Sequence, residues 1–143
     1  MQTDWRIWAL ASAFFAALTA LLAKVGVAGV SSNLATVVRT AVIFCFGIVL
    51  VWATGERRGL SALGARTWLF LVLSGLATGL SWLCYFRALQ LGDASRVAPV
   101  DKLSVVFVIV LAALFLDEKL SWQQWVGGVL ICSGAIILAL KKA

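Results

Sequence analysis

Five long apolar runs set the fold class of this chain. They cover roughly residues 5–25, 34–53, 67–91, 94–116 and 122–140 of 143. Each run holds about the 20 apolar residues that a helix needs to cross the hydrocarbon core of a bilayer. With 63% hydrophobic and 13% charged residues, the chain is also far more apolar than a soluble domain. The sequence therefore predicts an all-α polytopic membrane protein with five transmembrane helices.

The segments between these runs are short and contain turn-forming residues. They read GVAGVSSN, TGERRGLSALGAR, LGD and LDEKLS. None has room for a soluble domain, so residues 1–143 are predicted to form a single domain whose neighbouring helices pack antiparallel. The first run is longer than the apolar region of a signal peptide and follows no clear basic segment, so we expect it to remain as a spanning helix.

Charge and motif content exclude several classes of function. The net charge is +6, from 12 Lys and Arg against 6 Asp and Glu, and histidine is absent. The basic residues flank the apolar runs, as lipid-anchoring residues do, instead of forming a basic face for nucleic acid. The three cysteines form no CxxC pair, and neither a GxSxG motif nor a P-loop is present. We therefore predict no nucleic-acid partner, no cofactor, no metal site and no enzymatic activity.

The distribution of basic residues leaves the orientation in the membrane open. Five spans place the termini on opposite sides, and the basic residues divide evenly between the two sides. The N-terminal side holds Arg6, Arg57, Arg58, Arg66 and Lys119, and the other side holds Lys24, Arg87, Arg96, Lys141 and Lys142. Either the Arg57, Arg58 and Arg66 cluster fixes the N-terminus inside, or the chain has dual topology and pairs as an antiparallel dimer. We expect a homodimer and keep both arrangements open.

The fourth run carries the charges that lipid tolerates least. Asp101 and Lys102 are adjacent, and Asp101 is the one acidic residue inside a predicted span. An acidic residue at a helix centre costs roughly 2.5–3.5 kcal/mol on insertion, so we expect Asp101 to have a polar partner. Neighbouring helical residues point about 100° apart, which predicts that one of the two faces inward and the other faces a neighbouring helix. If transport is coupled to protons, Asp101 is the candidate carrier.

The only proline of the chain, Pro99, lies two residues before this pair. In a helix that begins near Ala94, Pro99 leaves the carbonyl of Ser95 without its usual donor, and transporters use such carbonyls to coordinate solutes or ions. Alternatively, the helix begins at Pro99 itself, which places Asp101 in its first turn as an ordinary carboxylate. The short LGD turn argues against this later start, because it would require a longer unstructured link at membrane depth.

Two further polar features lie within the runs. Trp82 sits in the middle of the third run, one turn from Tyr85, whereas the other six tryptophans lie near predicted helix ends. We weigh equally a packed aromatic residue and a residue that lines a solute path. Arg39 lies about five residues into the second run, where it either snorkels to the interface or meets a carboxylate inside the bundle. Lys24 and Arg87 lie near helix ends and are expected to snorkel.

Residues 85–138 show a family resemblance in detail. They read YFRALQLGDASRVAPVDKLSVVFVIVLAALFLDEKLSWQQWVGGVLICSGAIIL. The matching features are Tyr85, Ala88 and Leu89, a tight turn, an Ala-Ser start, a Leu-Phe-Leu end, Glu118, Leu120, Ser121, Gly127 or Gly128, and Gly134. This pattern resembles the second half of an EamA domain of the drug/metabolite transporter superfamily. Arg39 also falls where such domains often place an arginine.

The resemblance implies a small-solute transporter fold in which most members join two five-helix units in inverted orientation. This chain holds one unit, half of such a ten-helix fold, which favours a homodimer. Two features depart from the family pattern: many members place the proline near the position of Val105 instead of Pro99, and the Asp101-Lys102 pair is not general. The superfamily handles amino acids, sugars, nucleotide-linked compounds and toxic cations, so the resemblance does not choose a substrate.

These observations predict a multi-pass protein of the cell membrane, or of the inner membrane in a bacterium. We expect a secondary transporter that moves a small organic metabolite or drug by alternating access across a homodimer. The predicted solute-binding residues are Arg39, Trp82, Tyr85, Asp101, Lys102 and Ser104. The alternative is a non-transporting membrane assembly or interaction protein, whose polar residues only lock helices together.

Overall fold

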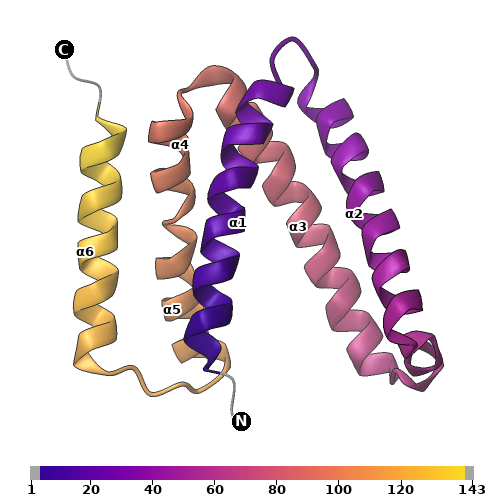
Figure 1. Cartoon of the computed structure of the whole chain (residues 1–143). Helices are drawn as coiled ribbons and strands as arrows, with labels where there is room; N and C mark the ends of the chain where they lie inside the picture. Colours follow the sequence, from indigo (N-terminus) through magenta and orange to yellow (C-terminus); the bar gives the residue numbers. More distant parts are fainter. Residues whose placement is uncertain (1–3, 141–143) are drawn as a thin grey trace. The chain divides into compact units, whose positions relative to one another are not determined.

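The computed structural model describes residues 4–140 and builds this part of the chain from helices, without a strand (Figure 1). The elements in chain order are α1 (Trp5–Gly26), α2 (Ser32–Thr54), the short 3₁₀ helix η1 (Glu56–Ala62), α3 (Ala65–Leu91), α4 (Ala94–Asp101), α5 (Ser104–Phe115) and α6 (Trp122–Ala139). The side chains of Arg58, Leu60 and Ser61, and the whole of Lys141 and Lys142, lie outside the described residues.

Five helical stretches of the described chain are long and apolar enough to cross a membrane. They are α1, α2, α3, α6 and the pair α4 and α5, which together cover Ala94–Phe115. Their bounds agree to within about two residues with the ranges that the apolar runs predict, which is the usual uncertainty of helix ends. The all-α, five-span prediction is confirmed.

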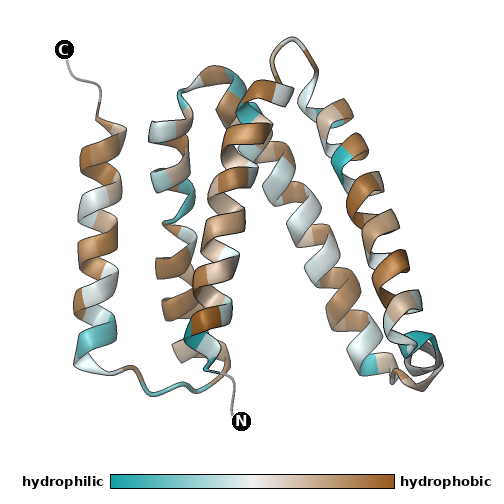
Figure 2. Cartoon of the chain, in the orientation of Figure 1, coloured by the Kyte–Doolittle hydropathy of each residue, from teal (hydrophilic) through white to brown (hydrophobic). Residues whose placement is uncertain are grey.

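The outer surface of these helices is apolar, as a bilayer requires (Figure 2). Phe14, Val49 and Leu80 are 67%, 65% and 66% exposed, whereas Phe86 and Leu89 are almost completely buried. On a soluble protein, apolar surface of this extent would drive association. In lipid it is solvated, because the hydrocarbon tails are as apolar as leucine. The chain is a multi-pass membrane protein.

The chain divides into two compact units. One, here called the hairpin unit, comprises residues 23–90 and holds α2, η1 and α3. The other, here called the terminal unit, comprises the described residues 4–22 and 91–140 and holds most of α1 together with α4, α5 and α6. The division falls within the last turn and a half of α1, so this helix contributes to both units.

Local capping residues explain where several helices begin and end. Ser31 caps the start of α2, where its hydroxyl accepts a 3.3 Å hydrogen bond from the Leu34 amide. Gly55 ends α2 in the left-handed conformation, with φ of 73°, which a residue with a side chain rarely adopts. At the start of α6, Ser121 and Gln124 form a reciprocal capping box. These sequence signals therefore fix the ends of two of the five spans.

The fourth span differs from its prediction, because it is broken into two helices. α4 begins at Ala94 and ends at Asp101, and α5 begins only at Ser104. Across the break, the amide of Leu103 donates to the carbonyl of Val100 over 3.0 Å, a three-residue spacing in place of the four-residue spacing of an α-helix. The expectation of one continuous helix over residues 94–116 is wrong at this break. The alternative of a helix that begins at Pro99 is also wrong.

Proline chemistry gives a physical reason for the break. Pro99 has no amide hydrogen, and its ring crowds the carbonyl of Ser95, which would be its partner in a regular helix. The helix responds within one turn: the amide of Lys102 donates both to the Ala98 carbonyl over 3.2 Å and to the Pro99 carbonyl over 3.1 Å. This shared bond marks the transition from α-helical to 3₁₀ bonding. The effect of Pro99 is therefore an interruption of the α-helix a few residues after the proline itself.

Helix α6 packs against both α4 and α5 within the terminal unit (Figure 1). Gly128 is buried in α6, and a β-carbon at this position would stand 3.7 Å from the Cδ1 atom of Ile109 in α5. Small residues allow such close approach, which drives helix association in membranes. Helix α6 thus supports both halves of the broken span.

Candidate functional site

Arg39 is the cation that lies farthest from a helix end in the hairpin unit. Helix α2 begins at Ser32, so Arg39 lies about 10 Å along the axis from that end. Its guanidinium carbon lies 4.3 Å from the ring centroid of Trp82 and 5.5 Å from that of Phe86. Both distances fall within the range of cation–π interactions. The sequence offered the interface or a carboxylate as partners for Arg39, and the structure shows aromatic rings.

The aromatic partners of Arg39 come from one face of α3. Trp82 and Phe86 are four residues apart, and Tyr85 lies between them, one turn from Trp82. Thr78 continues this face, but its hydroxyl donates to the carbonyl of Ser74 over 2.9 Å. The structure thus brings Arg39 and Trp82 together, and it gives Trp82 a partner on another helix.

The second polar group lies at the break between α4 and α5. The Nζ atom of Lys102 lies 3.4 Å from the Oδ2 atom of Asp101. The side chain of Lys102 is 58% exposed, and that of Asp101 is 37% exposed. The sequence predicted that these side chains diverge, yet they form an ion pair with each other. They can do so because Asp101 is the last residue of α4 and Lys102 already belongs to the turn.

Two other polar groups lie within a few residues of this ion pair in the sequence. Pro99 deprives the carbonyl of Ser95 of its usual donor, as the sequence predicts for a helix that begins at Ala94. Ser104 is exposed and opens α5, three residues after Asp101. The break therefore collects a carboxylate, an ammonium group and a hydroxyl within one span.

The six predicted solute-binding residues fall into two groups. Arg39, Trp82 and Tyr85 belong to the hairpin unit, and Asp101, Lys102 and Ser104 belong to the terminal unit. The structure shows Arg39 in contact with Trp82 in the first group, and Asp101 in contact with Lys102 in the second. That both groups line one solute path remains a prediction.

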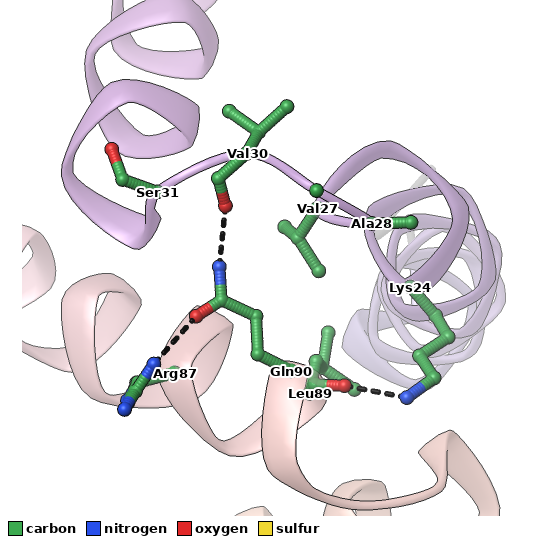
Figure 3. Close-up of a pocket in the computed structure, with 9 residues that line it drawn as sticks. Lys24, Val27, Ala28, Val30, Ser31, Arg87, Leu89 and Gln90 are labelled. Carbon is green, nitrogen blue, oxygen red and sulfur yellow. Dashed lines mark hydrogen bonds between the residues drawn. The ribbon is translucent and has the colours of Figure 1, made fainter.

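A pocket of about 450 Å³ lies in the hairpin unit, where the sequence predicted only membrane anchors (Figure 3). It is lined by Lys24, residues 27–31, Arg87, Leu89 and Gln90. The side-chain amide of Gln90 donates to the Val30 carbonyl over 2.6 Å and accepts from Arg87 over 3.2 Å. Lys24 donates to the Leu89 carbonyl over 2.6 Å. The Gln90 bond attaches the loop between α1 and α2 to the last turn of α3, and the Lys24 bond attaches the last turn of α1 to it.

Gln90 was the available sequence signal for this attachment. It is an uncharged polar residue in the last turn of an otherwise apolar helix, where carbonyl groups lack intrahelical donors. Lys24 supplies one of the missing donors. Lys24 and Arg87 were expected to extend toward the membrane interface. In the structure they instead form hydrogen bonds with Leu89 and Gln90, which line the pocket.

Fold and site together define a class of protein. Five spans, an apolar lipid-facing surface, a broken helix and charged residues held inside the spans are features of polytopic membrane transporters. The chain matches the EamA-like transporter family over residues 4–140 and belongs to that family. The resemblance seen in the sequence is confirmed, and the protein is a transporter of small solutes.

The chain is similar to a relative of nearly the same length and to a longer relative of which it covers about half. An uncharacterized transporter in the cobO 3' region of a Sinorhizobium species is 57% identical over 140 residues, which cover 98% of this chain and 99% of that protein. A protein of Streptantibioticus cattleyicolor, named as a probable terminal-alkyne amino-acid exporter, is 31% identical over 150 residues, which cover 98% of this chain and 46% of that protein. An uncharacterized protein of Methanocaldococcus jannaschii is 32% identical over 73 residues, which cover 51% of this chain and 53% of that protein. No solved structure matches the chain.

Proposed function

We propose that the protein is a secondary transporter that moves a small organic metabolite by alternating access within a homodimer. Membership of the EamA-like family supports the transport of small solutes. The Sinorhizobium relative, of nearly the same length, is itself named as a transporter. These likenesses support the transport activity of the chain.

The longer relative supports a dimer. The chain matches 46% of the Streptantibioticus cattleyicolor protein, so two copies together have about its length. Many transporters are built from two such halves, with the solute bound near the midplane at their interface. A homodimer of this chain supplies two halves from one sequence.

The broken fourth span carries the proposal. Discontinuous helices form solute sites in transporters, because their interrupted backbone and polar side chains can face a cavity at membrane depth. Here the break holds Asp101, Lys102 and Ser104. We infer that these residues line the solute path together with Arg39, Trp82 and Tyr85, and that the break allows the two halves of the span to change direction during the cycle.

A ligand screen followed by a transport assay tests this function. A solute that binds only the folded protein raises its melting temperature, so purified protein is screened by thermal shift against amino acids, sugars and organic cations. Amino acids come first, because the Streptantibioticus cattleyicolor relative is named as an amino-acid exporter. A stabilising compound is then assayed for movement across the membrane of proteoliposomes. If no compound of the panel stabilises the protein or crosses the membrane, the result counts against this proposal and favours the alternative of a non-transporting assembly protein.

A further inference from the structure

We propose that the transported solute carries a carboxylate and that the guanidinium group of Arg39 binds it. This proposal rests on the proposed transport function and adds the charge class of the solute. The aromatic rings of Trp82 and Phe86 hold the cation in place, and the apolar surface around them accommodates the remainder of the solute.

The hydrogen bonding of Arg39 differs from that of Lys24, Arg96 and Lys102, whereas the guanidinium groups of Arg6 and Arg66, at the starts of α1 and α3, also contact only aromatic rings in the described part of the chain. Lys102 pairs with Asp101, Arg96 donates to the Ala139 carbonyl, and Lys24 donates to the Leu89 carbonyl. Arg39 contacts Trp82 and Phe86, but within the described residues no hydrogen bond or ion pair joins it to another side chain or carbonyl. A guanidinium group has five N–H donors, and here all of them remain for a ligand.

The charge of Arg39 is also uncompensated within its unit. Neither α2 nor α3 contains an aspartate or a glutamate. The acidic residue of the hairpin unit is Glu56 in η1, beyond the far end of α2 and about 25 Å along the axis from Arg39. A cation at membrane depth is costly without a partner. An anionic solute would supply that partner, whereas a cationic solute would add repulsion.

The geometry favours a carboxylate among anions. A guanidinium group presents a planar fork of donors that matches the two oxygens of a carboxylate, and it stacks on aromatic rings while it does so. The contacts with Trp82 and Phe86 are made with the rings and use none of the N–H donors of Arg39 in a hydrogen bond to a protein acceptor. Arg39 contributes a single positive charge, which a monoanion neutralises and a phosphate dianion would exceed.

The test compares probes that differ only in charge. 3-Phenylpropionate, 3-phenylpropanamide and 3-phenylpropylamine share one carbon skeleton and are anionic, neutral and cationic at pH 7, and hexanoate, hexanamide and hexylamine repeat the series without a ring. Binding of each probe, and of every compound that stabilises the protein in the broader screen, is measured on the purified full chain and on Arg39→Gln. Arg39→Lys keeps the charge without the fork, and it replaces Arg39→Gln if that variant does not fold.

Arg66→Gln is the matched control. Arg66 also lies near an aromatic ring, with its guanidinium carbon 5.9 Å from the Phe70 centroid, but it stands at the start of α3. We expect Arg39→Gln and Arg39→Lys to weaken the binding of carboxylates by about tenfold or more, and Arg66→Gln to leave it unchanged. Carboxylates should bind at least about tenfold more tightly than their amides or amines.

Each other outcome has a definite meaning. Tightest binding of amines or of uncharged compounds, or equal loss of carboxylate binding in the Arg66→Gln control, overturns the carboxylate proposal while transport stands. Carboxylate binding that Arg39→Gln and Arg39→Lys leave intact overturns it as well, because the anion then binds elsewhere. If no compound of any charge binds the wild-type protein or crosses a membrane with it, the proposed transport function itself fails.

Discussion

The guanidinium group of Arg96 donates a hydrogen bond to the carbonyl of Ala139 over 2.8 Å. Arg96 lies in the first turn of α4, and Ala139 is the last residue of α6. An arginine at the C-terminal end of a helix satisfies a carbonyl that has no intrahelical donor and complements the helix dipole. This bond therefore ties the entry to the broken span to the helix that supports both of its halves.

Replacement of Arg96 by alanine should lower the stability of the protein. The side chain is partly buried, and loss of a hydrogen bond from a charged group costs about 1.5–3 kcal/mol. We expect a lower melting temperature in detergent for Arg96→Ala. Arg6→Ala is the control, because the Arg6 guanidinium contacts only the neighbouring Trp5 ring among the described contacts. Equal melting temperatures for the two variants would contradict a structural role for the Arg96 bond.

Replacement of Pro99 by alanine should slow transport without a loss of stability. Alanine restores an amide hydrogen to the helix and removes the ring that crowds the Ser95 carbonyl, so the break loses its cause. The melting temperature should stay the same or rise, while the initial rate of solute uptake into proteoliposomes falls. Val100→Ala, one residue along, should change neither quantity appreciably. Wild-type uptake by Pro99→Ala would show that the break has no part in the transport cycle.

If transport is coupled to protons through Asp101, replacement of this residue by asparagine removes the pH dependence of transport. Asp101 is the one carboxylate inside a described span, and asparagine keeps its shape but cannot take up or release a proton. Uptake is measured across a pH series for Asp101→Asn and for Lys102→Gln. A flat profile for the first variant and a sloping profile for the second are expected. A wild-type slope in Asp101→Asn would assign proton coupling to another group or to none.

Replacement of Gln90 by alanine should loosen the loop between α1 and α2. The variant loses the 2.6 Å bond from Gln90 to the Val30 carbonyl, at a cost of about 0.5–1.5 kcal/mol for a neutral hydrogen bond. Hydrogen exchange of the amides of residues 27–31 should become faster. Gln123→Ala in α6 is the control for the loss of a glutamine, and its exchange in this loop should match the wild type. Unchanged exchange in both variants would exclude a restraining role for Gln90.

Reporter fusions at both termini test the dual-topology hypothesis. If the chain inserts both ways up, a fusion at either end should give a mixed signal, with some molecules reporting each side of the membrane. One uniform orientation for all molecules would leave a parallel dimer. Disulfide cross-linking between cysteines introduced on α6 then measures whether two copies associate at all.

Hydropathy predicts the spans because length and apolarity suffice to place a helix in a bilayer. Capping residues such as Ser31, Gly55 and Ser121 add the ends, since each satisfies specific backbone groups. The position of the break was not predictable to the residue. Pro99 disturbs the helix, but the α-helical hydrogen-bond pattern changes only after Asp101. The exact position of this change depends on packing against α6 and on the backbone geometry of several residues.

The contact of Arg39 with Trp82 was also not predictable from the sequence. Each residue stood out alone, as a charge and as an aromatic ring at membrane depth. Their contact depends on how α2 and α3 are rotated about their axes and shifted along them. The sequence of a helix that is apolar on all sides does not indicate this, because it has no distinct polar face. The sequence therefore identified the residues, and their partner came from the packing of two helices.

The two halves of the fourth span have lengths of about 12 Å for α4 and 18 Å for α5. Neither alone crosses a hydrocarbon core of about 30 Å, so their junction lies inside it. A charge that moves across the membrane gains or loses about 2.3 kcal/mol per 100 mV. With both charges of the Asp101–Lys102 pair present, the junction is neutral and its movement is insensitive to the membrane voltage. In the Asp101→Asn variant the lysine charge is left alone, and the same movement then becomes voltage-dependent.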